Sequence, residues 1–229
     1  ENDYGFAVIF ELDVIECAKV ADEAGIESFS AGVGDLEFFA TQAHSVVLGA
    51  IAQATKNIKI ASSSTIISTS DPVRVYEDFA TIDLISNGRA EIVAGRASRV
   101  GLFDLLGYDI RHYEELFEEK FELLLQINKE EVLNWSGNYR APLKNAQILP
   151  RPKEGKIPIW RAVGGTPASA IKAGYAGVPM FMAHLGGPAS IFKNTIDAYR
   201  EAARSNGFNP AELPVATAGF FYASESSQQ

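Results

Sequence analysis

Hydrophobic residues follow two alternating patterns along most of the chain. Short runs of β-branched and apolar residues, typical of buried strands, alternate with segments whose apolar residues recur every three or four positions, as in amphipathic helices. The clearest example covers residues 58–98. There, residues 58–67 predict a strand, Pro72 begins a helix with Asp71 as its N-cap, residues 86–88 end that helix, and residues 90–94 predict a second strand. This stretch therefore reads as one strand–helix–strand unit.

The same patterns assign most of the remaining chain. They predict strands at residues 4–10, 26–34, 157–163, 178–183 and 215–222, and helices at residues 12–24, 42–55, 113–129, 168–176 and 190–205. Residues 100–108 are predicted as a loop, and the proline-rich residues 134–152 as an excursion without long regular elements. Repeated β/α units predict one domain over residues 1–229, with a parallel sheet covered by helices. A doubly wound sheet and a (β/α)8 barrel both fit.

Composition and charge narrow the function. The formal net charge of −9 argues against nucleic acid as a main partner, because binding phosphate backbones needs a basic face. Cys17 is the single cysteine and is predicted to be a small buried hydrophobe, so neither a disulfide framework nor a cysteine metal cluster is expected. No apolar run reaches membrane-spanning length. We therefore expect a cytoplasmic protein without a membrane partner or a metal.

The sharpest candidate site is the stretch Gly164-Gly165-Thr166-Pro167-Ala168-Ser169. It follows a predicted strand and opens a predicted helix, where free backbone N–H groups and the helix dipole favour an anion. Thr166 and Ser169 add hydroxyl donors. An ordinary strand–helix turn capped by Thr166 is the alternative. The stretch is neither a Walker loop nor the G-x-G-x-x-G fingerprint of dinucleotide-binding proteins.

Two further polar strand ends fall on the same predicted edge of the sheet. Arg96 follows the strand at residues 90–94 and has the geometry for a bidentate phosphate contact, although a structural ion pair is the alternative. Residues 62–64, three serines, leave room for a flat ligand, and a hydrogen-bonded serine run in the core is the alternative. The three histidines share no metal-ligand spacing; His44 is expected to be a surface or partly buried structural residue, and His184 is the one best placed for the ligand face.

Several separated stretches together resemble the bacterial luciferase-like, flavin-dependent monooxygenases. They are ASSSTIISTSDPVRVYEDFATIDLISNGRAEIVAGRAS, LGYD, YEELFEEKFELLL, WSGNYRAPL, LPRP, IPIWRAVGGTPASAIKAGYAGVPM and HLGGPASIFKNTIDAYREAA. The resemblance implies a (β/α)8 barrel that binds reduced FMN at its C-terminal face. It also implies a separate flavin reductase as partner, O2 and a small organic substrate such as an aldehyde, and a homodimer.

The resemblance also implies roles for individual residues. Ser63 and Ser64 match the strand end that supports the isoalloxazine ring, often through an unusual peptide bond, and Arg96 matches the arginine that contacts the phosphate. The phosphate loop corresponds to Gly164, Gly165, Thr166 and Ser169, and a strand-end loop near the flavin corresponds to Gly186 and Gly187. No catalytic residue is assigned.

The chain departs from the family pattern in three places. Similar members carry Glu-His-His after the second strand, whereas here residues 32–34 run directly into Asp35-Leu36-Glu37. The first strand passes to its helix almost without a loop, and the chain ends where the family adds roughly one or two further β/α units, so an incomplete barrel is expected. Either loops and a C-terminal portion are absent from this sequence, or the protein is a shortened relative. A flavin-binding protein without turnover and a deazaflavin-dependent oxidoreductase are therefore the alternatives to the monooxygenase.

Overall fold

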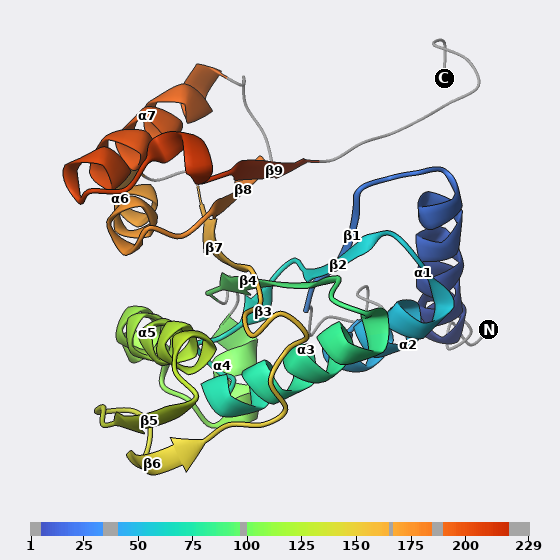
Figure 1. The fold of residues 1–229 in the computed structure, drawn as a ribbon, viewed down its shortest axis with the longest axis horizontal. Helices are drawn as coiled ribbons and strands as arrows, with labels where there is room; N and C mark the ends of the chain where they lie inside the picture. The colour runs from blue at the N-terminus through green and yellow to red at the C-terminus, as the bar shows by residue number, and fades with distance from the viewer. Residues whose placement is uncertain (1–5, 34–40, 97–99, 165–166, 185–189, 220–229) are drawn as a thin grey trace. The chain divides into compact units, whose positions relative to one another are not determined.

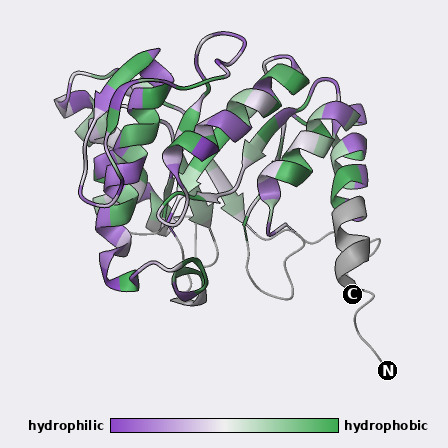
Figure 2. Cartoon of the chain, turned by 90° about the horizontal axis from the view of Figure 1, so that it is seen from below, coloured by the Kyte–Doolittle hydropathy of each residue, from purple (hydrophilic) through white to green (hydrophobic). Residues whose placement is uncertain are grey.

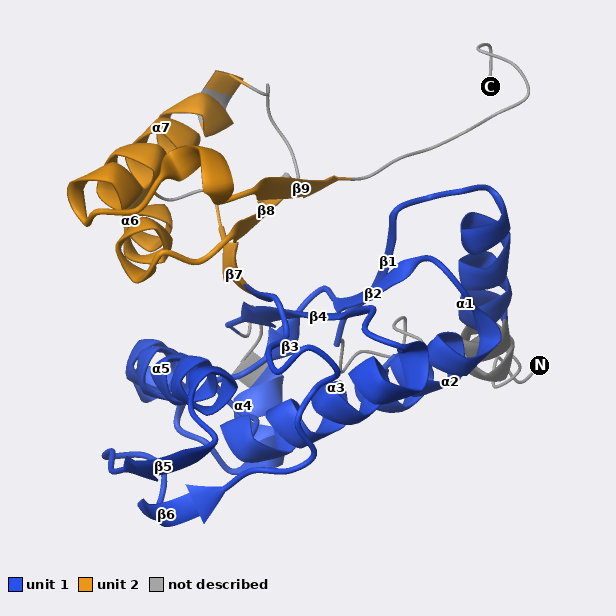
Figure 3. Cartoon of the chain, viewed as in Figure 1, with its two compact units in different colours: residues 1–159 blue, residues 160–229 orange. Residues whose placement is uncertain are grey.

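The computed structural model describes residues 6–33, 41–96, 100–164, 167–184 and 190–219. Its helices and strands are interspersed along the chain (Figure 1). The chain divides into two compact units, residues 1–159 and residues 160–229 (Figure 3). Each unit contains parallel strands, so the β/α organisation predicted from the sequence is confirmed within both.

Unit 1 contains most of the regular elements. Its helices are α1 (Phe6–Glu23), α2 (His44–Ala54), α3 (Pro72–Ser86), α4 (Val100–Leu106) and α5 (Tyr113–Lys129), with a 3₁₀ turn at Ile110–His112. Its strands are β1 (Ser28–Ala31), β2 (Lys59–Ser62), β3 (Thr65–Ile66), β4 (Ala90–Gly95), β5 (Val132–Trp135) and β6 (Leu143–Gln147).

The sheet of unit 1 is parallel. Strand β2 lies between β1 and β4, with Phe29 opposite Ile60 on one side and Ile60 opposite Ala90 on the other. The short strand β3 continues the same stretch of chain and also pairs with β4, Thr65 opposite Ala94. Because these strands run in one direction, their carboxyl ends meet at one edge of the sheet.

Helices α2, α3 and α5 form the apolar core of unit 1 together with the sheet. Figure 2 shows that the helices of the chain carry both hydrophobic and hydrophilic residues, and the residues that α2, α3 and α5 bury are mostly apolar. The fully buried side chains come from all of these elements: Leu48, Ile51, Ile60, Tyr76, Phe79, Ile92, Phe117 and Leu124. Burying a side chain of this size contributes about 1.5–3 kcal/mol, so the packing fixes how the strand ends are presented.

Helix α3 begins and ends as the sequence predicts. The Asp71 carboxylate accepts a hydrogen bond from the Val73 backbone N–H at 2.8 Å, and Pro72 occupies the first helical position. Asn87 ends the helix with φ of 64°, and Gly88 follows with φ of 92°, the left-handed conformation favoured at helix ends. The predicted excursion at residues 134–152 contains the antiparallel hairpin of β5 and β6.

Unit 2 is a smaller β/α assembly. It contains most of β7 (Ile159–Val163), followed by α6 (Pro167–Ala176), β8 (Met180–His184), α7 (Ser190–Ser205), a 3₁₀ turn at Pro210–Glu212 and β9 (Val215–Gly219). The three strands are parallel in the order β7, β8, β9. Helices α6 and α7 pack closely, because a Cβ on Gly174 would lie 2.5 Å from the Tyr199 carbonyl oxygen.

Three predictions from the sequence are wrong. The strand expected at residues 4–10 is helical from Phe6 onward, because a continuous apolar run fits either element and no turn residue separates it from the following helix. The loop expected at residues 100–108 contains α4, whose Leu102 and Phe103 are buried. Cys17 is exposed, not buried.

Candidate functional site

The serines after β2 mark a break in the sheet of unit 1. The strand predicted at residues 58–67 divides into β2 and β3 at Ser63-Ser64, whose peptide bond is cis. Just before the break, the Ser62 hydroxyl accepts a hydrogen bond from the Val93 N–H at 2.9 Å and lies 3.2 Å from the Val93 carbonyl oxygen. Both Ser63 and Ser64 are half-buried. The strand end therefore presents an irregular, small-residue surface.

Gly32 supports this surface from the neighbouring strand. A Cβ at Gly32 would lie 2.2 Å from the Ser63 carbonyl oxygen and 3.3 Å from the Ser64 nitrogen. Only a residue without a side chain fits such a close approach of two backbones. The Thr41 hydroxyl donates to the Gly32 carbonyl oxygen at 2.5 Å, which holds the segment in place. Gly32 falls inside the strand predicted at residues 26–34, and its contact with Ser63, which the structure shows just after β1, was not revealed by the sequence.

Arg96 lies at the carboxyl end of β4, beside the end of β3, where Ile66 is opposite Gly95. Its guanidinium is 3.3 Å from a Glu114 carboxylate oxygen and lies over the Phe117 ring, 5.0 Å from the ring centroid. The Arg96 side chain is 20% exposed. Arg96 therefore makes the ion pair expected of a structural residue. It is also partly exposed at the carboxyl ends of the strands, where ligands of parallel sheets bind, so a phosphate contact fits as well.

The phosphate loop predicted in unit 2 is described only in part. Gly164 follows β7 and is exposed, with open space around its Cα, and Ser169 is buried in the first turn of α6. Gly165 and Thr166 lie outside the described residues, as do Gly186 and Gly187 after β8. The backbone of His184 ends β8. Helix α6 follows the loop and begins at Pro167, one residue before the helix predicted at residues 168–176.

His44 and Thr65 form a contact that the sequence did not reveal, because 21 residues separate them. The His44 Nε2 atom lies 2.8 Å from the Thr65 hydroxyl oxygen. Burial lowers the pKa of His44 to about 4, so the imidazole is neutral near pH 7. Both residues line a cavity of about 320 Å³ that is bordered by α2, α3 and α4. His44 is thus the partly buried residue expected, and it has a specific partner.

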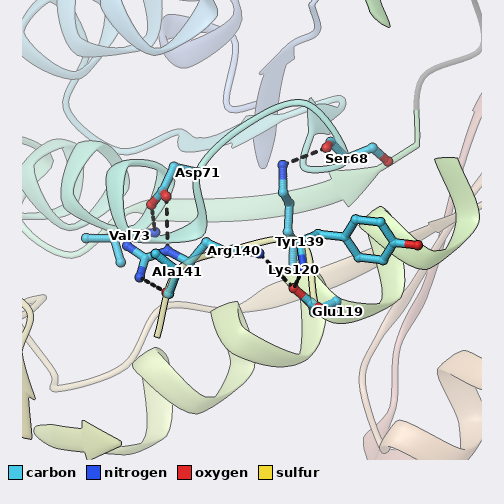
Figure 4. Close-up of polar contacts among 8 residues, drawn as sticks. All are labelled: Ser68, Asp71, Val73, Glu119, Lys120, Tyr139, Arg140 and Ala141. Atoms are coloured by element: carbon cyan, nitrogen blue, oxygen red, sulfur yellow. Dashed lines mark hydrogen bonds and ion pairs between the residues drawn. The ribbon is translucent and has the colours of Figure 1, made fainter. Parts of the chain in front are cut away.

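A cluster of charged residues fixes the segment that follows the serines (Figure 4). The Lys120 ammonium donates to the Ser68 carbonyl oxygen at 2.7 Å and lies 4.2 Å from the centroid of the Tyr108 ring. Lys120 is 2% exposed, and burial lowers its pKa to about 8. A buried lysine on α5 thus anchors the turn between β3 and α3.

The same cluster attaches the proline-rich excursion to α3 and α5. The Arg140 guanidinium donates to the Asp71 carboxylate at 3.1 Å, so one carboxylate both caps α3 and binds the excursion. The Glu119 carboxylate accepts backbone N–H groups from Asn138, Tyr139 and Arg140 at 2.6–3.1 Å, and Figure 4 draws it with the last two. Charge-assisted hydrogen bonds of this kind are roughly twice as strong as neutral ones. The cluster is therefore best understood as support for the strand-end site.

The donor set fits a phosphorylated flavin-type cofactor. Half-buried serines and a glycine form a small-residue surface suited to a flat ring, and an accessible arginine at the adjacent strand end suits a phosphate. Among the described residues, no three His, Cys, Asp or Glu side chains converge as a metal site would require. None of the described helices has the length and apolar character needed to cross a membrane.

Comparison with known proteins decides the family. The model of the luciferase-like monooxygenase family matches residues 12–229. The chain belongs to this family. The predicted resemblance is therefore confirmed, and the fold is the luciferase-like (β/α)8 barrel, of which the described strands form an incomplete part; the doubly wound alternative is excluded.

Individual relatives of this luciferase-like chain differ in cofactor. An F420-dependent glucose-6-phosphate dehydrogenase of Amycolatopsis mediterranei is 28% identical over 173 residues, 72% of this chain and 51% of the relative. The monooxygenase RslO1 of Streptomyces bottropensis superposes with a TM-score of 0.90 at 24% identity, covering 98% of this chain and 69% of that one.

A third similar protein contains FMN. It is the oxygenating constituent of 3,6-diketocamphane monooxygenase from the CAM plasmid of Pseudomonas putida, whose structure was solved in complex with FMN. It superposes with a TM-score of 0.77 at 20% identity, covering 90% of this chain and 60% of that one. The chain spans about half the length of the curated relatives it matches.

Proposed function

We propose that this luciferase-like chain is part of an FMN-dependent monooxygenase that uses reduced flavin and O2 to oxygenate a small organic substrate such as an aldehyde. The observation that carries the proposal is the strand-end arrangement in unit 1. Ser63-Ser64 lie between β2 and β3, and Arg96 follows β4, which pairs with both, so a surface for a flat ring and a phosphate-binding cation lie on neighbouring parallel strands. The FMN-containing structural relative supports the choice of cofactor.

Each residue in the proposal has a defined task. The Ser63-Ser64 segment supports the ring, and Gly32 keeps that segment in position by its close backbone contact. Arg96 donates N–H groups to the phosphate. In unit 2, the first turn of α6 after Gly164, including Ser169, offers donors to an anionic group, and the Gly186-Gly187 loop is proposed as a further cofactor contact. The bound flavin supplies the oxygen chemistry, and the chain binds, orients and shields it from water.

The proposal includes partners that remain to be tested. A separate flavin reductase would supply the reduced cofactor. A homodimer would bury exposed apolar side chains on α2 and α3, where Val46, Leu84 and Ile85 are 71%, 47% and 48% exposed. Light scattering on a size-exclusion column tests the dimer. A cytoplasmic location is also part of the proposal, and cell fractionation tests it.

The deciding experiment supplies purified protein with FMN, NADH, a flavin reductase and an aldehyde. Formation of the carboxylic acid with one ¹⁸O atom from ¹⁸O2, measured by mass spectrometry, is the expected result. Tight FMN binding without oxygenation of any substrate in a panel would instead favour the flavin-binding protein without turnover. Absence of FMN binding would refute the FMN proposal.

A second candidate function is hydride transfer with the deazaflavin F420. The F420-dependent relative at 28% identity favours it. The test is to titrate F420 against the protein and follow its fluorescence. Micromolar F420 affinity together with no detectable FMN affinity would select the deazaflavin enzyme over the monooxygenase.

A further inference from the structure

Arg96, the residue proposed to bind the cofactor phosphate, already has an acidic neighbour. Its guanidinium lies 3.3 Å from Glu114, which stands in the first turn of α5, and it rests on the ring of Phe117 one turn further along the same helix. Phe117 is fully buried, so this ring is a fixed platform. The ring and the carboxylate together define where the Arg96 charge sits.

We propose that Glu114 is a positioning residue that shares the Arg96 guanidinium with the cofactor phosphate and thereby weakens phosphate binding. The inference rests on the proposed function, because it assigns Arg96 to a phosphate. A carboxylate beside the guanidinium accepts one of its N–H groups and offsets its charge. Any phosphate that contacts Arg96 must therefore compete with Glu114.

The charge of the ligand determines how strong this competition is. A phosphomonoester such as that of FMN carries a charge near −2 at pH 7 to 8, whereas riboflavin has the same ring and no phosphate. Removing the Glu114 charge should therefore strengthen FMN binding and leave riboflavin binding unchanged. Half-exposed ion pairs contribute up to about 1 kcal/mol, which corresponds to roughly fivefold in affinity.

The experiment measures dissociation constants for FMN and riboflavin by quenching of flavin fluorescence. The variants are the unaltered protein, E114Q, and E115Q as a control, because Glu115 is the next residue of α5, is exposed and changes the net charge equally. We expect E114Q to bind FMN about fivefold more tightly, with riboflavin unchanged, and E115Q to resemble the unaltered protein. Tighter binding cannot arise from damage to the fold.

A double variant tests whether Glu114 acts through Arg96. In an R96Q background, the E114Q change should no longer improve FMN binding, because the shared group is gone. The same series with F420 and its phosphate-free chromophore applies the test to the deazaflavin alternative, with a smaller gain because a phosphodiester carries one charge.

The outcomes separate the two proposals. If the unaltered protein binds FMN more tightly than riboflavin but E114Q leaves both affinities unchanged or weakens FMN, the role of Glu114 is refuted while the proposed function stands. If E114Q improves FMN and riboflavin equally, Glu114 acts on the ring or on the fold and the proposal is again refuted. If neither flavin nor deazaflavin binds any variant, the proposed function fails together with the inference.

Discussion

Gly32 offers the sharpest test of how the strand-end site is built. The substitution Gly32→Ala would place a methyl carbon 2.2 Å from the Ser63 carbonyl oxygen and 2.8 Å from the Ser63 carbonyl carbon. Ordinary contact between such atoms requires at least 3.4 Å, so the two backbone segments must separate by about 1 Å. The hydrogen bond from the Ser63 N–H to the Ala31 carbonyl oxygen, 2.8 Å long, lies directly beside the clash and would lengthen.

The magnitude follows from these contacts. Overpacking of a well-packed site costs about 1–3 kcal/mol, and weakening one backbone hydrogen bond adds about 1 kcal/mol. Alanine returns about 0.4–1 kcal/mol because it reduces the conformational freedom of the unfolded chain. The net expectation is a loss of roughly 1–3 kcal/mol in the free energy of unfolding. Because Ser63-Ser64 is displaced, flavin affinity should fall at least tenfold.

Gly49 provides a matched control for the same chemical change. It lies inside α2, and a Cβ there would meet no heavy atom within 4 Å. Gly49→Ala should therefore stabilise the protein by about 0.5–1 kcal/mol, since alanine is the better helix former. Urea unfolding followed by circular dichroism, with flavin titration on the same samples, measures both variants. Equal shifts of the urea midpoint in the two variants, or unchanged flavin affinity in Gly32→Ala, would refute the reasoning.

Three buried polar groups give further predictions. Burial lowers the pKa of Lys120 from the usual 10.5 to about 8, so between these pH values the unfolded chain binds more protons than the folded one. The free energy of unfolding should therefore rise across this pH window by up to about 3 kcal/mol in the unaltered protein, but not in Lys120→Met. Urea midpoints that change in parallel for the two proteins at pH 7.5, 8.5 and 9.5 would contradict this. Burial lowers the pKa of His44 from 6.5 to about 4, so the stability contributed by its neutral ring is fully present above pH 6.5 and is lost toward pH 4, by up to about 3 kcal/mol. His44→Gln should flatten this pH dependence. A urea midpoint that falls equally below pH 6.5 in both proteins would count against it. The Tyr76 hydroxyl is buried and has no hydrogen-bond partner among the described residues, so Tyr76→Phe should raise the free energy of unfolding by about 1 kcal/mol. Tyr199→Phe should instead lower it, because the Tyr199 hydroxyl donates to the Val178 carbonyl oxygen at 2.8 Å. Thermal melts in which both variants shift the melting temperature in the same direction would refute the contrast.

Local patterns predicted the elements around residues 58–98 well. The Asp71 cap, the start of α3 at Pro72 and the turn at Asn87-Gly88 all depend on interactions within a few residues, which a sequence displays directly. The extra turn of α1 at Phe6 and the helix α4 were mistaken because short apolar runs do not distinguish helices from strands or loops. Tertiary packing decides such segments.

Contacts between distant residues could not be predicted in the same way. The close approach of Gly32 to Ser63, the pair of His44 with Thr65, and the anchoring of the Ser68 carbonyl by Lys120 each join segments 21 to 52 residues apart. The sequence indicated which residue types are suited to a site, but their partners depend on how strands and helices pack. The exposure of Cys17 depends on the same packing.

The division of one predicted strand into β2 and β3 has a consequence for the length of this segment. Ala61 pairs with Glu91 and Thr65 with Ala94, so four steps along one strand correspond to three along β4. The surplus residue reverses which side chains face each side of the sheet, as in a β-bulge, and the Ser62 hydroxyl fills the gap in the ladder at Val93. Deleting one serine would turn Thr65 and Ile66 to the opposite faces. Evolution can therefore exchange residues in this segment far more readily than it can change their number.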